Sequence, residues 1–346
     1  MPKTSSKILV IRLSSLGDLI LMIPMLSALR KSFREGELVL LTKEKYAGLL
    51  MGNDLLDRLI LMREGGMREL LRLRSELSRE RFDIIIDAHN VIRSNILFHT
   101  LSAREKLQIH KNEIAKILLI RGKTNLYKRI ISQSERYASI AERLGAETNA
   151  GDAELPIPDG ARAHAESVLA GNRRAGQAFI AFAPGARWQT KVWPPEHFVR
   201  LIESVSAQGY APVLIGGAED TASNAELAKR IPSSPLDLTG TLSIIETAAV
   251  LKKCAALVTN DSAPLHLAEA VETPVVAFFG PTVREFGYFP RLGRSIALEV
   301  KLPCRPCSRN GARACPYGTK ECLTAIAPEE ALAALLAVLE KRQGLS

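Results

Sequence analysis

The feature of this sequence that most limits its fold is a regular alternation of short apolar runs with stretches of helical periodicity. The apolar runs predict strands at Ile8–Arg12, Leu38–Thr42, Asp83–Asp87, Phe179–Ala183, Pro212–Ile215, Ala255–Val258 and Val275–Phe279. Helices are predicted between them at Leu19–Ser32, Met67–Glu80, Ala161–Ala170, His197–Gln208, Ala222–Arg230, Ile244–Lys253 and Leu265–Val271. Strands that alternate with helices in this way form mainly parallel sheets. The predicted fold is therefore α/β, with two doubly wound domains facing a central cleft.

A proline-rich segment near the middle of the chain separates the two predicted domains. Residues 155–160 read Leu-Pro-Ile-Pro-Asp-Gly, a combination typical of a linker. The 346 residues suit two domains of ordinary size, which we place at residues 1–160 and 161–346. Neither domain contains G-x-G-x-x-G or G-x-x-x-x-G-K-[ST], so the sequence gives no support to a dinucleotide-dependent dehydrogenase or a P-loop enzyme.

The hydropathy of the chain predicts a cytoplasmic protein. No uninterrupted apolar run approaches the roughly 20 residues that a membrane-spanning helix needs. The N-terminal segment is basic and then briefly apolar, but no small-residue cleavage site follows it. We therefore interpret this segment as the first strand and not as a signal peptide.

The positive charge of the chain is concentrated in one stretch. The formal net charge is +9. Within residues 91–129 only Glu105 and Glu113 oppose nine basic residues, which are Arg93, Arg104, Lys106, Lys111, Lys116, Arg121, Lys123, Lys128 and Arg129. Such a concentration attracts anionic ligands, acidic lipid headgroups or nucleic acid. Few aromatic residues accompany it to stack on bases, which argues against nucleic acid. An ordinary solvated helical face is the alternative interpretation.

Residues 260–266, Asn-Asp-Ser-Ala-Pro-Leu-His, form a polar turn between a predicted strand and a predicted helix. In an open α/β sheet such a turn lies at the carboxyl edge of the strands, where ligands bind. Asp261 or Ser262 is suited to cap the helix and Pro264 to its first turn. The free N–H groups at the helix start favour a phosphate, and His266 is placed to reach the same ligand. The alternative is a capped helix that merely carries a histidine.

Two further turns of the second half carry charges suited to a nucleotide diphosphate. After its first predicted strand, Arg187 and Lys191 follow a Pro-Gly turn and are suited to neutralise phosphates. After its second, a Gly-Gly turn leads to Glu219 and Asp220, where a carboxylate can accept hydrogen bonds from ribose hydroxyls. Helix capping explains either acid equally well, and Lys191 alone is also compatible with a solvated loop lysine.

The corresponding turn of the first half runs from Arg12 to Asp18 and joins the first strand to the first helix. This position predicts that Asp18 faces the cleft, where its carboxylate can accept a proton from an incoming hydroxyl. The alternative is that Asp18 only caps its helix. Because a helix N-terminus makes an acid a weaker base, catalysis here requires partial desolvation or a late proton transfer.

Four motifs in a fixed order give the sequence a resemblance to a known family. They are Arg12-Leu13-Ser14-Ser15-Leu16-Gly17-Asp18, Pro184-Gly185 leading to Lys191-Val192-Trp193-Pro194, Gly216-Gly217-Ala218-Glu219, and Asn260-Asp261-Ser262-Ala263-Pro264-Leu265-His266 through Phe279-Gly280-Pro281-Thr282. From about Ile8 to the C-terminal helix the chain resembles glycosyltransferase family 9, the ADP-heptose:lipopolysaccharide heptosyltransferases.

The resemblance implies the GT-B architecture, in which two Rossmann-like domains divide the substrates between them. The C-terminal domain would hold the sugar nucleotide and the N-terminal domain the acceptor. The implied reaction is an inverting transfer of heptose from ADP-heptose to a lipopolysaccharide inner-core acceptor of the lipid A–Kdo type. It implies no catalytic metal and no other cofactor.

The resemblance also implies roles for individual residues. Asp18 matches the family's proposed general base, and Lys191 matches the lysine that contacts the donor phosphates. The other matched donor positions are Glu219 near the ribose, Leu242 against adenine, Asp261 against the sugar, and Ser262, Ala263 and His266 at the phosphates and sugar. Arg187 joins them through the phosphate argument above.

An anionic, lipid-linked oligosaccharide is the acceptor that the basic stretch favours. The candidate acceptor-binding residues are Ser14, Ser15, Arg93, Arg104, Lys106 and Lys111. Acidic headgroups would hold the enzyme peripherally at the inner face of the cytoplasmic membrane, and no nucleic acid partner is expected.

Four of the five cysteines fall in one loop before the last predicted helix. Cys304, Cys307, Cys315 and Cys322 follow the pattern C-x2-C-x7-C-x6-C, which is compatible with a structural Zn²⁺ ion. Reduced cytosolic thiols favour a metal over a disulfide. One or two disulfides and free thiols remain the alternatives.

Two other functions compete with a heptosyltransferase. One is a GT-B enzyme that uses a different nucleotide sugar, as a transferase or an epimerase. The other is a non-catalytic module that binds anionic lipid through residues 91–129. The joint presence of Asp18, Lys191, Glu219, Asp261 and His266 argues against the second, because a binding module has no need for all five.

Overall fold

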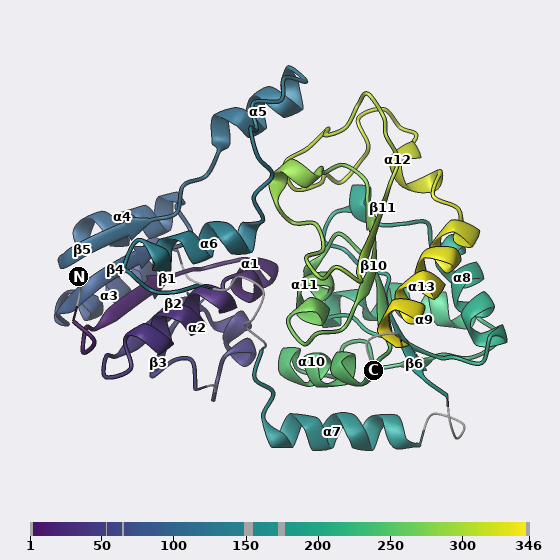
Figure 1. The fold of residues 1–346 in the computed structure, drawn as a ribbon, viewed down its shortest axis with the longest axis horizontal. Coiled ribbons are helices and arrows are strands. Elements are labelled where there is room, and N and C mark those ends of the chain that lie inside the picture. Colours follow the sequence, from purple (N-terminus) through teal and green to yellow (C-terminus); the bar gives the residue numbers. More distant parts are fainter. Residues whose placement is uncertain (1–2, 53, 64–65, 149–154, 172–176, 344–346) are drawn as a thin grey trace. The chain divides into compact units, whose positions relative to one another are not determined.

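The chain forms two compact units, each built around a parallel β-sheet (Figure 1). The structure is a computed structural model that describes residues 3–52, 54–63, 66–148, 155–171 and 177–343. The first unit comprises Met1–Asn112 and Ile131–Pro156, and the second comprises Glu113–Ile130 and Ile157–Ser346. The segment 113–130, which we expected in the first domain, therefore packs with the second unit.

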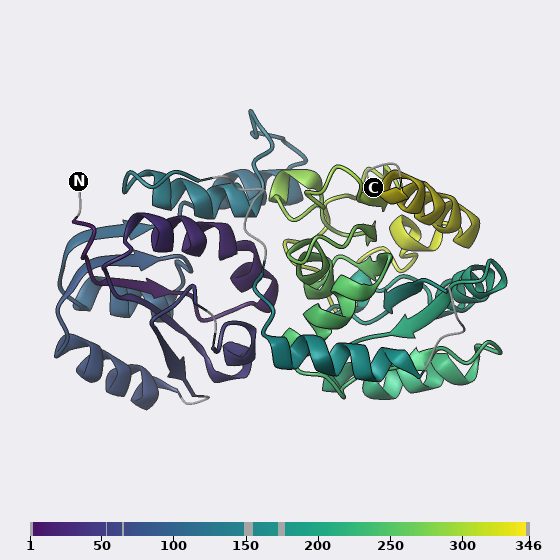
Figure 2. The same cartoon turned by 60° about the horizontal axis from the view of Figure 1, so that its bottom comes forward.

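The first unit is a sheet with the order β3-β2-β1-β4-β5, and every pairing described in it is parallel. Its strands are β1 (Ile8–Ile11), β2 (Leu38–Lys43), β3 (Arg58–Met62), β4 (Phe82–Asp87) and β5 (Ala103–Gln108). The central strands are nearly continuous runs of buried aliphatic residues, as a sheet covered on both faces requires. Helices α3 (Met67–Ser78) and α4 (Ile92–Thr100) pack on one face. Helices α1 (Leu16–Leu21), α2 (Ile23–Ser32) and α6 (Gln133–Glu142) lie on the other (Figure 2).

A break divides the single helix that the sequence predicted over residues 19–32. Helix α1 ends before Met22, and α2 starts at Ile23 with Pro24 in its first turn. Because proline has no N–H to donate to the preceding turn, the α-helical ladder cannot continue through this position. The break lets the short α1 carry Asp18 at the end of β1.

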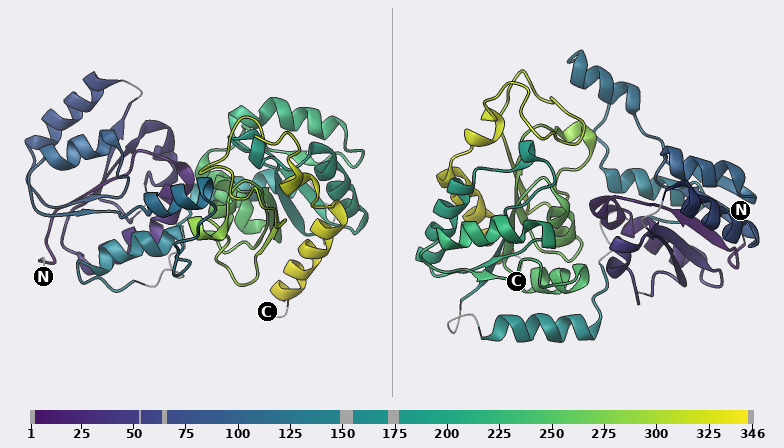
Figure 3. Two further views of the ribbon diagram at one scale, coloured as in Figure 1. Left: turned by 90° about the horizontal axis from the view of Figure 1, so that it is seen from above. Right: turned by 180° about the vertical axis from the view of Figure 1, so that it is seen from behind.

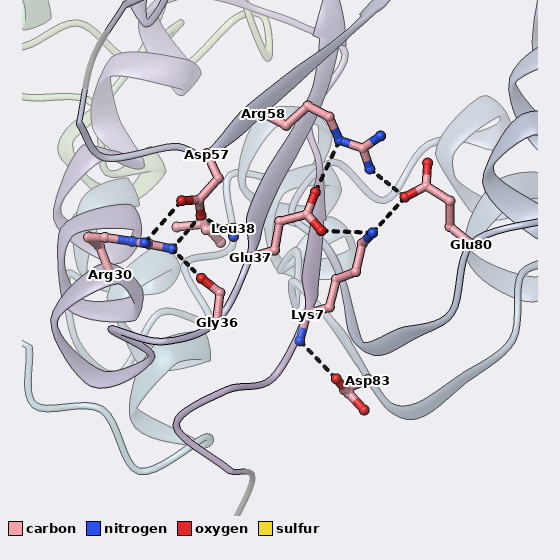
Figure 4. Close-up of polar contacts among 9 residues, drawn as sticks. All are labelled: Lys7, Arg30, Gly36, Glu37, Leu38, Asp57, Arg58, Glu80 and Asp83. Atoms are coloured by element: carbon pink, nitrogen blue, oxygen red, sulfur yellow. Dashed lines mark hydrogen bonds and ion pairs between the residues drawn. The ribbon is translucent and has the colours of Figure 1, made fainter.

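The amino edge of the first sheet is held by a network of charged residues that lie at the starts of the strands or just before them (Figure 4). Lys7 Nζ lies 2.7 Å from Glu37 Oε2 and 2.8 Å from Glu80 Oε2. Arg58 contacts the same two carboxylates. Immediately before β3, Asp57 Oδ2 accepts from the backbone N–H of Leu38 at 2.6 Å. These charges join adjacent strands, so they serve stability at the edge away from the predicted site.

The Glu80→Gln variant is expected to lower the free energy of unfolding by about 1–2 kcal/mol at pH 7, since it removes one charge from a partly buried network. The hydrogen bond from Arg58 is the largest influence on the pKa of Glu80 and holds it below the ordinary value. A carboxylate with a lowered folded-state pKa contributes stability above its unfolded pKa of about 4.3, and that stability is lost as the pH falls through the folded value.

Thermal unfolding at several pH values tests this expectation. The difference between wild type and Glu80→Gln should be largest at pH 7 and should shrink as the pH falls below about 4. Glu76→Gln, which removes an exposed helical ion pair with Arg72, is the matched control and should change little. A pH-independent difference would contradict the electrostatic explanation.

The second unit is a sheet with the order β11-β10-β9-β6-β7-β8, again parallel at every described pairing. Its strands are β6 (Phe179–Ala183), β7 (Ala211–Leu214), β8 (Leu236–Asp237), β9 (Ala256–Asn260), β10 (Val275–Phe279) and β11 (Ile296–Glu299). One face packs against α8 (Pro195–Ala207), α9 (Thr221–Lys229), α12 (Glu321–Thr324) and α13 (Pro328–Gln343). The other is covered by α10 (Ile244–Lys253) and α11 (Ala263–Glu269), and α7 (Asp159–Ala170) packs against α10.

The predicted α/β fold with two parallel sheets is confirmed, and the seven predicted strands are present in it. The strands that we did not predict, β3, β5, β8 and β11, are the four edge strands of the two sheets. An edge strand has one open side and needs no continuous apolar run, as the sequence Ala-Arg-Glu-Lys-Leu-Gln of β5 shows. No helix in the described part of the chain is both long and apolar enough to cross a membrane.

Candidate active site

Each sheet has one point where the strand order reverses, and the predicted site residues follow the strands on either side of it. In the first sheet the chain proceeds from β1 outward to β3 and then crosses to β4 and β5. In the second it proceeds from β6 outward to β8 and then crosses to β9. The loops that leave two such neighbouring strands diverge at the carboxyl edge, where open α/β sheets bind ligands.

In the second unit this point is occupied by an ion pair between Lys191 and Asp261. Lys191 belongs to the short helix η2 (Gln189–Lys191) after β6, and its Nζ lies 2.6 Å from Asp261 Oδ2 after β9. Thr282, in the loop after β10, donates from Oγ1 to the same carboxylate oxygen at 2.6 Å. The Lys191 and Asp261 side chains are only 14% and 6% exposed. The loops that follow β6, β9 and β10 thus hold the Lys191 ammonium and the Asp261 carboxylate together in a position that is largely shielded from solvent.

The side chain of Asn260 positions the loop that carries Lys191. Its Nδ2 donates to the carbonyl oxygen of Pro184 at 2.6 Å, and its Oδ1 accepts from the backbone N–H of Trp193 at 2.9 Å. The Trp193 ring is fully buried and stacks on Phe278 with 4.1 Å between ring centroids. The sequence shows Asn260 and Thr282 only as members of motifs without a role of their own. The signal that identifies them is their position at the end of β9 and in the loop after β10.

The start of α11 differs from the capped helix that we considered as the alternative. Ser262 is the N-cap residue, but its side chain makes no capping hydrogen bond, and its Oγ lies 3.4 Å from the carbonyl oxygen of Asn260. Asp261 is engaged with Lys191. Ser262 and Ala263 are half-buried, while His266 is buried, with its ring centroid 6.1 Å from that of Tyr288.

The turn after β7 separates the roles of its two acids. Asp220 Oδ2 accepts from the backbone N–H of Gly217 at 3.1 Å, and its carboxylate lies against Gly185, where a Cβ atom would be 2.2 Å from Oδ1. Burial raises the pKa of Asp220 despite that hydrogen bond. Asp220 therefore stabilises the turns that follow β6 and β7. Glu219 beside it is exposed to solvent.

Leu242 and Arg187 are the two remaining residues predicted to bind the sugar nucleotide. Both belong to turns at the same edge of the sheet. The backbone N–H of Gly240, two residues before Leu242, donates to the carbonyl oxygen of Gly216 at 3.1 Å, so the turns after β7 and β8 are joined. Leu242 is half-buried. Arg187 is exposed, and its guanidinium carbon lies 5.3 Å from the centroid of the Trp188 ring.

In the first unit Asp18 lies at the corresponding reversal point and is buried. Arg12 NH2 lies 2.6 Å from Asp18 Oδ2, and Ser15 Oγ donates to that oxygen at 2.7 Å. The hydroxyl of Tyr137, from α6, donates to Oδ1 at 3.1 Å. Asp18 is the acid of a capping box with Ser15, so the structural role that we considered is present. The buried ion pair with Arg12 goes beyond what capping requires.

Two residues that the sequence did not single out complete this cluster. Arg12 NH1 donates to the carbonyl oxygen of Ala88 at 2.5 Å, which joins the loops after β1 and β4. His89 Nδ1 lies 3.4 Å from the backbone nitrogen of Leu13, and its Nε2 lies 3.5 Å from Ser14 Oγ. Burial, supported by the positive charge of Arg12, lowers the pKa of His89 to about 3, so the ring is neutral. Burial raises the pKa of Tyr137, so its hydroxyl stays protonated and donates the hydrogen bond to Asp18.

The basic stretch 91–129 does not form one helical face. Arg93 on α4 and Arg104 on β5 are exposed. Lys106 Nζ donates to the carbonyl oxygen of Phe98 at 2.8 Å, and Lys111 Nζ donates to that of Asn90 at 3.0 Å. The rest of the stretch includes α5 (Glu113–Arg121), which belongs to the second unit.

All five cysteines are free thiols in the structure. Cys304, Cys307 and Cys315 are half-buried, and Cys322 is buried. Burial raises the pKa of Cys307, and it raises that of Cys322 to about 11. Among the described residues, no three His, Cys, Asp or Glu side chains lie close enough together to hold a metal ion. The geometry of the loop therefore adds no support to the zinc prediction.

Comparison with known proteins identifies the family. The family model described as glycosyltransferase family 9 (heptosyltransferase) matches residues 70–318, well over half of the chain. The chain belongs to glycosyltransferase family 9. The resemblance inferred from the four motifs is thereby confirmed, and the chain is a glycosyltransferase.

Relatives and a solved structure support the same family. Lipooligosaccharide heptosyltransferase 2 of Haemophilus influenzae is 34% identical over 126 residues, which is 35% of either chain. Lipopolysaccharide heptosyltransferase 3 of Escherichia coli K12 is 26% identical over 294 residues, 78% of this chain and 81% of that protein. The structure of E. coli ADP-heptose lps heptosyltransferase II is similar with a TM-score of 0.76 at 22% identity, covering 97% of this chain and 99% of the other. This likeness confirms the GT-B fold.

Proposed function

We propose that this family 9 enzyme transfers a heptose from ADP-heptose to a lipopolysaccharide inner-core acceptor, with inversion and without a catalytic metal. The observation that carries the proposal is the Lys191–Asp261 ion pair at the reversal point of the second sheet. The names of similar proteins also support the proposal. They describe lipopolysaccharide heptosyltransferases, and one of them includes ADP-heptose.

Lys191 is the group suited to the leaving diphosphate. As the bond between the anomeric carbon and the phosphate oxygen breaks, negative charge accumulates on that oxygen. A fixed ammonium in a partly desolvated place stabilises this charge more in the transition state than in the bound substrate. The diphosphate of the donor competes with Asp261 for the ammonium of Lys191. Once displaced, the carboxylate of Asp261 is available to accept a hydrogen bond from a hydroxyl of the sugar.

Asp18 is the group suited to the attacking hydroxyl. The acceptor oxygen forms its bond to the anomeric carbon on the face opposite the departing ADP, which inverts that centre, and its proton passes to Asp18. The ion pair with Arg12 stabilises the carboxylate and so makes it a weak base. Proton transfer is accordingly late, after the attacking oxygen has become positively charged.

The remaining residues are assigned to binding. Glu219 is free of the capping role that Asp220 fulfils, and we assign it to the ribose. Leu242 is assigned to adenine, Arg187 to the diphosphate, and Ser262, Ala263 and His266 to the phosphates and sugar. The exposed Arg93 and Arg104 are assigned to an anionic acceptor. A lipid-linked acceptor requires a peripheral position of the enzyme at the cytoplasmic face of the membrane, which belongs to the same proposal.

A donor comparison tests the proposal. Purified protein is incubated with a lipid A–Kdo acceptor and with ADP-heptose, a UDP-sugar or a GDP-sugar, each with and without EDTA. We expect consumption of ADP-heptose alone, unaffected by EDTA, and a product whose anomeric configuration, read by NMR, is opposite to that of the donor. Preferential use of another nucleotide sugar, or epimerisation without an acceptor, would support the alternative enzyme. Elemental analysis of the same protein tests the proposed structural zinc.

A further inference from the structure

Helix α5 exposes its apolar side chains and buries a charged one. Ile114, Ile117 and Leu118 are 74%, 50% and 38% exposed, whereas Lys116 is buried. Positions 114, 117, 118 and 121 follow the i, i+3, i+4, i+7 spacing, so Arg121 ends the same stripe. The helix stands clear of the sheet of the second unit, to which it belongs (Figures 1 and 3). This face is the reverse of that expected for a helix in water.

The apolar exposure continues beyond the helix. Leu126 and Ile130 are 52% and 54% exposed, so the segment 113–130 contains five of the large apolar side chains that are exposed in the described part of the chain. Ile130 also lines a hollow of about 530 Å³ together with Leu302 and Pro303. We call the stripe Ile114, Ile117, Leu118 and Arg121 the α5 face.

Polar contacts with the rest of the second unit hold α5 at its first residue and just after its last. Arg309 NH2 lies 2.5 Å from Glu113 Oε1 at the start of α5. After the helix, Lys123 Nζ donates to the carbonyl oxygen of Pro306 at 2.7 Å, and Asn125 Nδ2 donates to Glu285 Oε1 at 2.8 Å. These contacts hold the backbone and leave the α5 face outward.

The charge of the segment complements an anionic surface. Residues 113–130 contain five basic residues and a single acid, Glu113, which is already paired with Arg309. Arg121, Lys128 and Arg129 are exposed next to the apolar side chains. Apolar side chains flanked by cations are the combination by which interfacial helices bind acidic bilayers, with the chains below the headgroups and the cations among them.

We propose that the α5 face docks on an anionic lipid bilayer, inserting Ile114, Ile117 and Leu118 between headgroups. The proposal deepens the proposed function, because that function requires a lipid-linked acceptor, but its binding step needs no glycosyl transfer. It locates membrane contact on the second unit and not on Arg93 or Arg104.

Vesicle co-sedimentation of the full chain tests the proposal. Vesicles of phosphatidylcholine alone are compared with vesicles containing one quarter phosphatidylglycerol. We expect wild type to bind the anionic vesicles and to be released by 0.5 M salt, since exposed charges are screened there. The triple variant Ile114→Ser/Ile117→Ser/Leu118→Ser should lower partitioning at least about tenfold. Arg121→Gln should lower it about fivefold.

The matched control lies on α3. Met67 and Leu71 are 60% and 51% exposed and one helical turn apart, so Met67→Ser/Leu71→Ser removes similar apolar surface elsewhere. We expect this variant to bind vesicles as wild type does. Consumption of ADP-heptose with a deacylated, water-soluble acceptor should be unchanged in the triple variant, which separates membrane docking from the transfer reaction.

Two results would overturn the docking proposal. One is equal partitioning of wild type and the triple variant. The other is a wild type that is dimeric by light scattering and becomes monomeric in the triple variant with vesicle binding unchanged, which would identify a second copy of this chain as the occupant. Absence of ADP-heptose transfer in wild type, with vesicle binding through α5 retained, would instead refute only the proposed function.

Discussion

Asp18→Asn is expected to reduce kcat for heptosyl transfer about 10²- to 10⁴-fold, with a much smaller change in the KM for the donor. The amide keeps the size of the side chain but cannot accept the proton of the attacking hydroxyl, and general base catalysis is worth about this factor. Initial rates at saturating donor, across a range of pH, are the measurement. A kcat within about threefold of wild type would show that Asp18 is only a capping residue.

The structural role of Asp18 requires controls, because the substitution leaves Arg12 buried without its carboxylate. Such a loss can cost about 3–5 kcal/mol of stability, so thermal unfolding is measured on the same samples and rates are taken well below the transition. Glu135→Gln alters the acid of the Ser132 capping box on α6, the same local motif without the predicted chemistry. It should leave kcat unchanged. Tyr137→Phe removes one donor to Asp18 and tests positioning, with an expected loss below about tenfold.

Lys191→Ala is expected to lower kcat/KM about 10²- to 10³-fold, the usual consequence of removing one group that stabilises developing negative charge. Part of the loss should appear as weaker binding of ADP, measured by calorimetry, since the diphosphate is charged before the reaction begins. The larger part should appear in kcat. Unchanged ADP binding and unchanged kcat would remove Lys191 from the site.

The partner of Lys191 supplies a sharper version of this test. Lys191→Ala leaves the buried carboxylate of Asp261 without its cationic partner, so part of the loss of activity comes from repulsion between this carboxylate and the diphosphate. The double variant Lys191→Ala/Asp261→Asn should therefore recover part of the ADP binding, though not kcat. Lys320→Met controls for the loop, because Lys320 Nζ donates to the backbone carbonyl oxygen of Val192, next to Lys191, at 2.9 Å. Its effect on kcat should be small.

The predictions from sequence succeeded where the structural requirement is local. A strand in the middle of a parallel sheet is covered on both faces, so β1, β6 and β9 read as buried apolar runs. An edge strand such as β5 is less constrained, and its sequence carries no comparable signal. Pro24 lies within the helix predicted over residues 19–32 and divides it into α1 and α2, because proline interrupts the hydrogen bonds of a helix even where the apolar periodicity continues.

The sequence by itself determined the order of strands and helices and the motifs that follow each central strand, since both depend on neighbours along the chain. Only the tertiary structure decided which side chains meet. Tyr137 reaches Asp18 across 119 positions of sequence, and Lys191 meets Asp261 because β6 and β9 are adjacent in the sheet. It also decided that Asp220 fills the capping role beside Glu219 and that α5 turns its apolar face outward. The reason is that strand order and burial, which bring distant residues together or expose them, are properties of the whole chain and leave no local pattern.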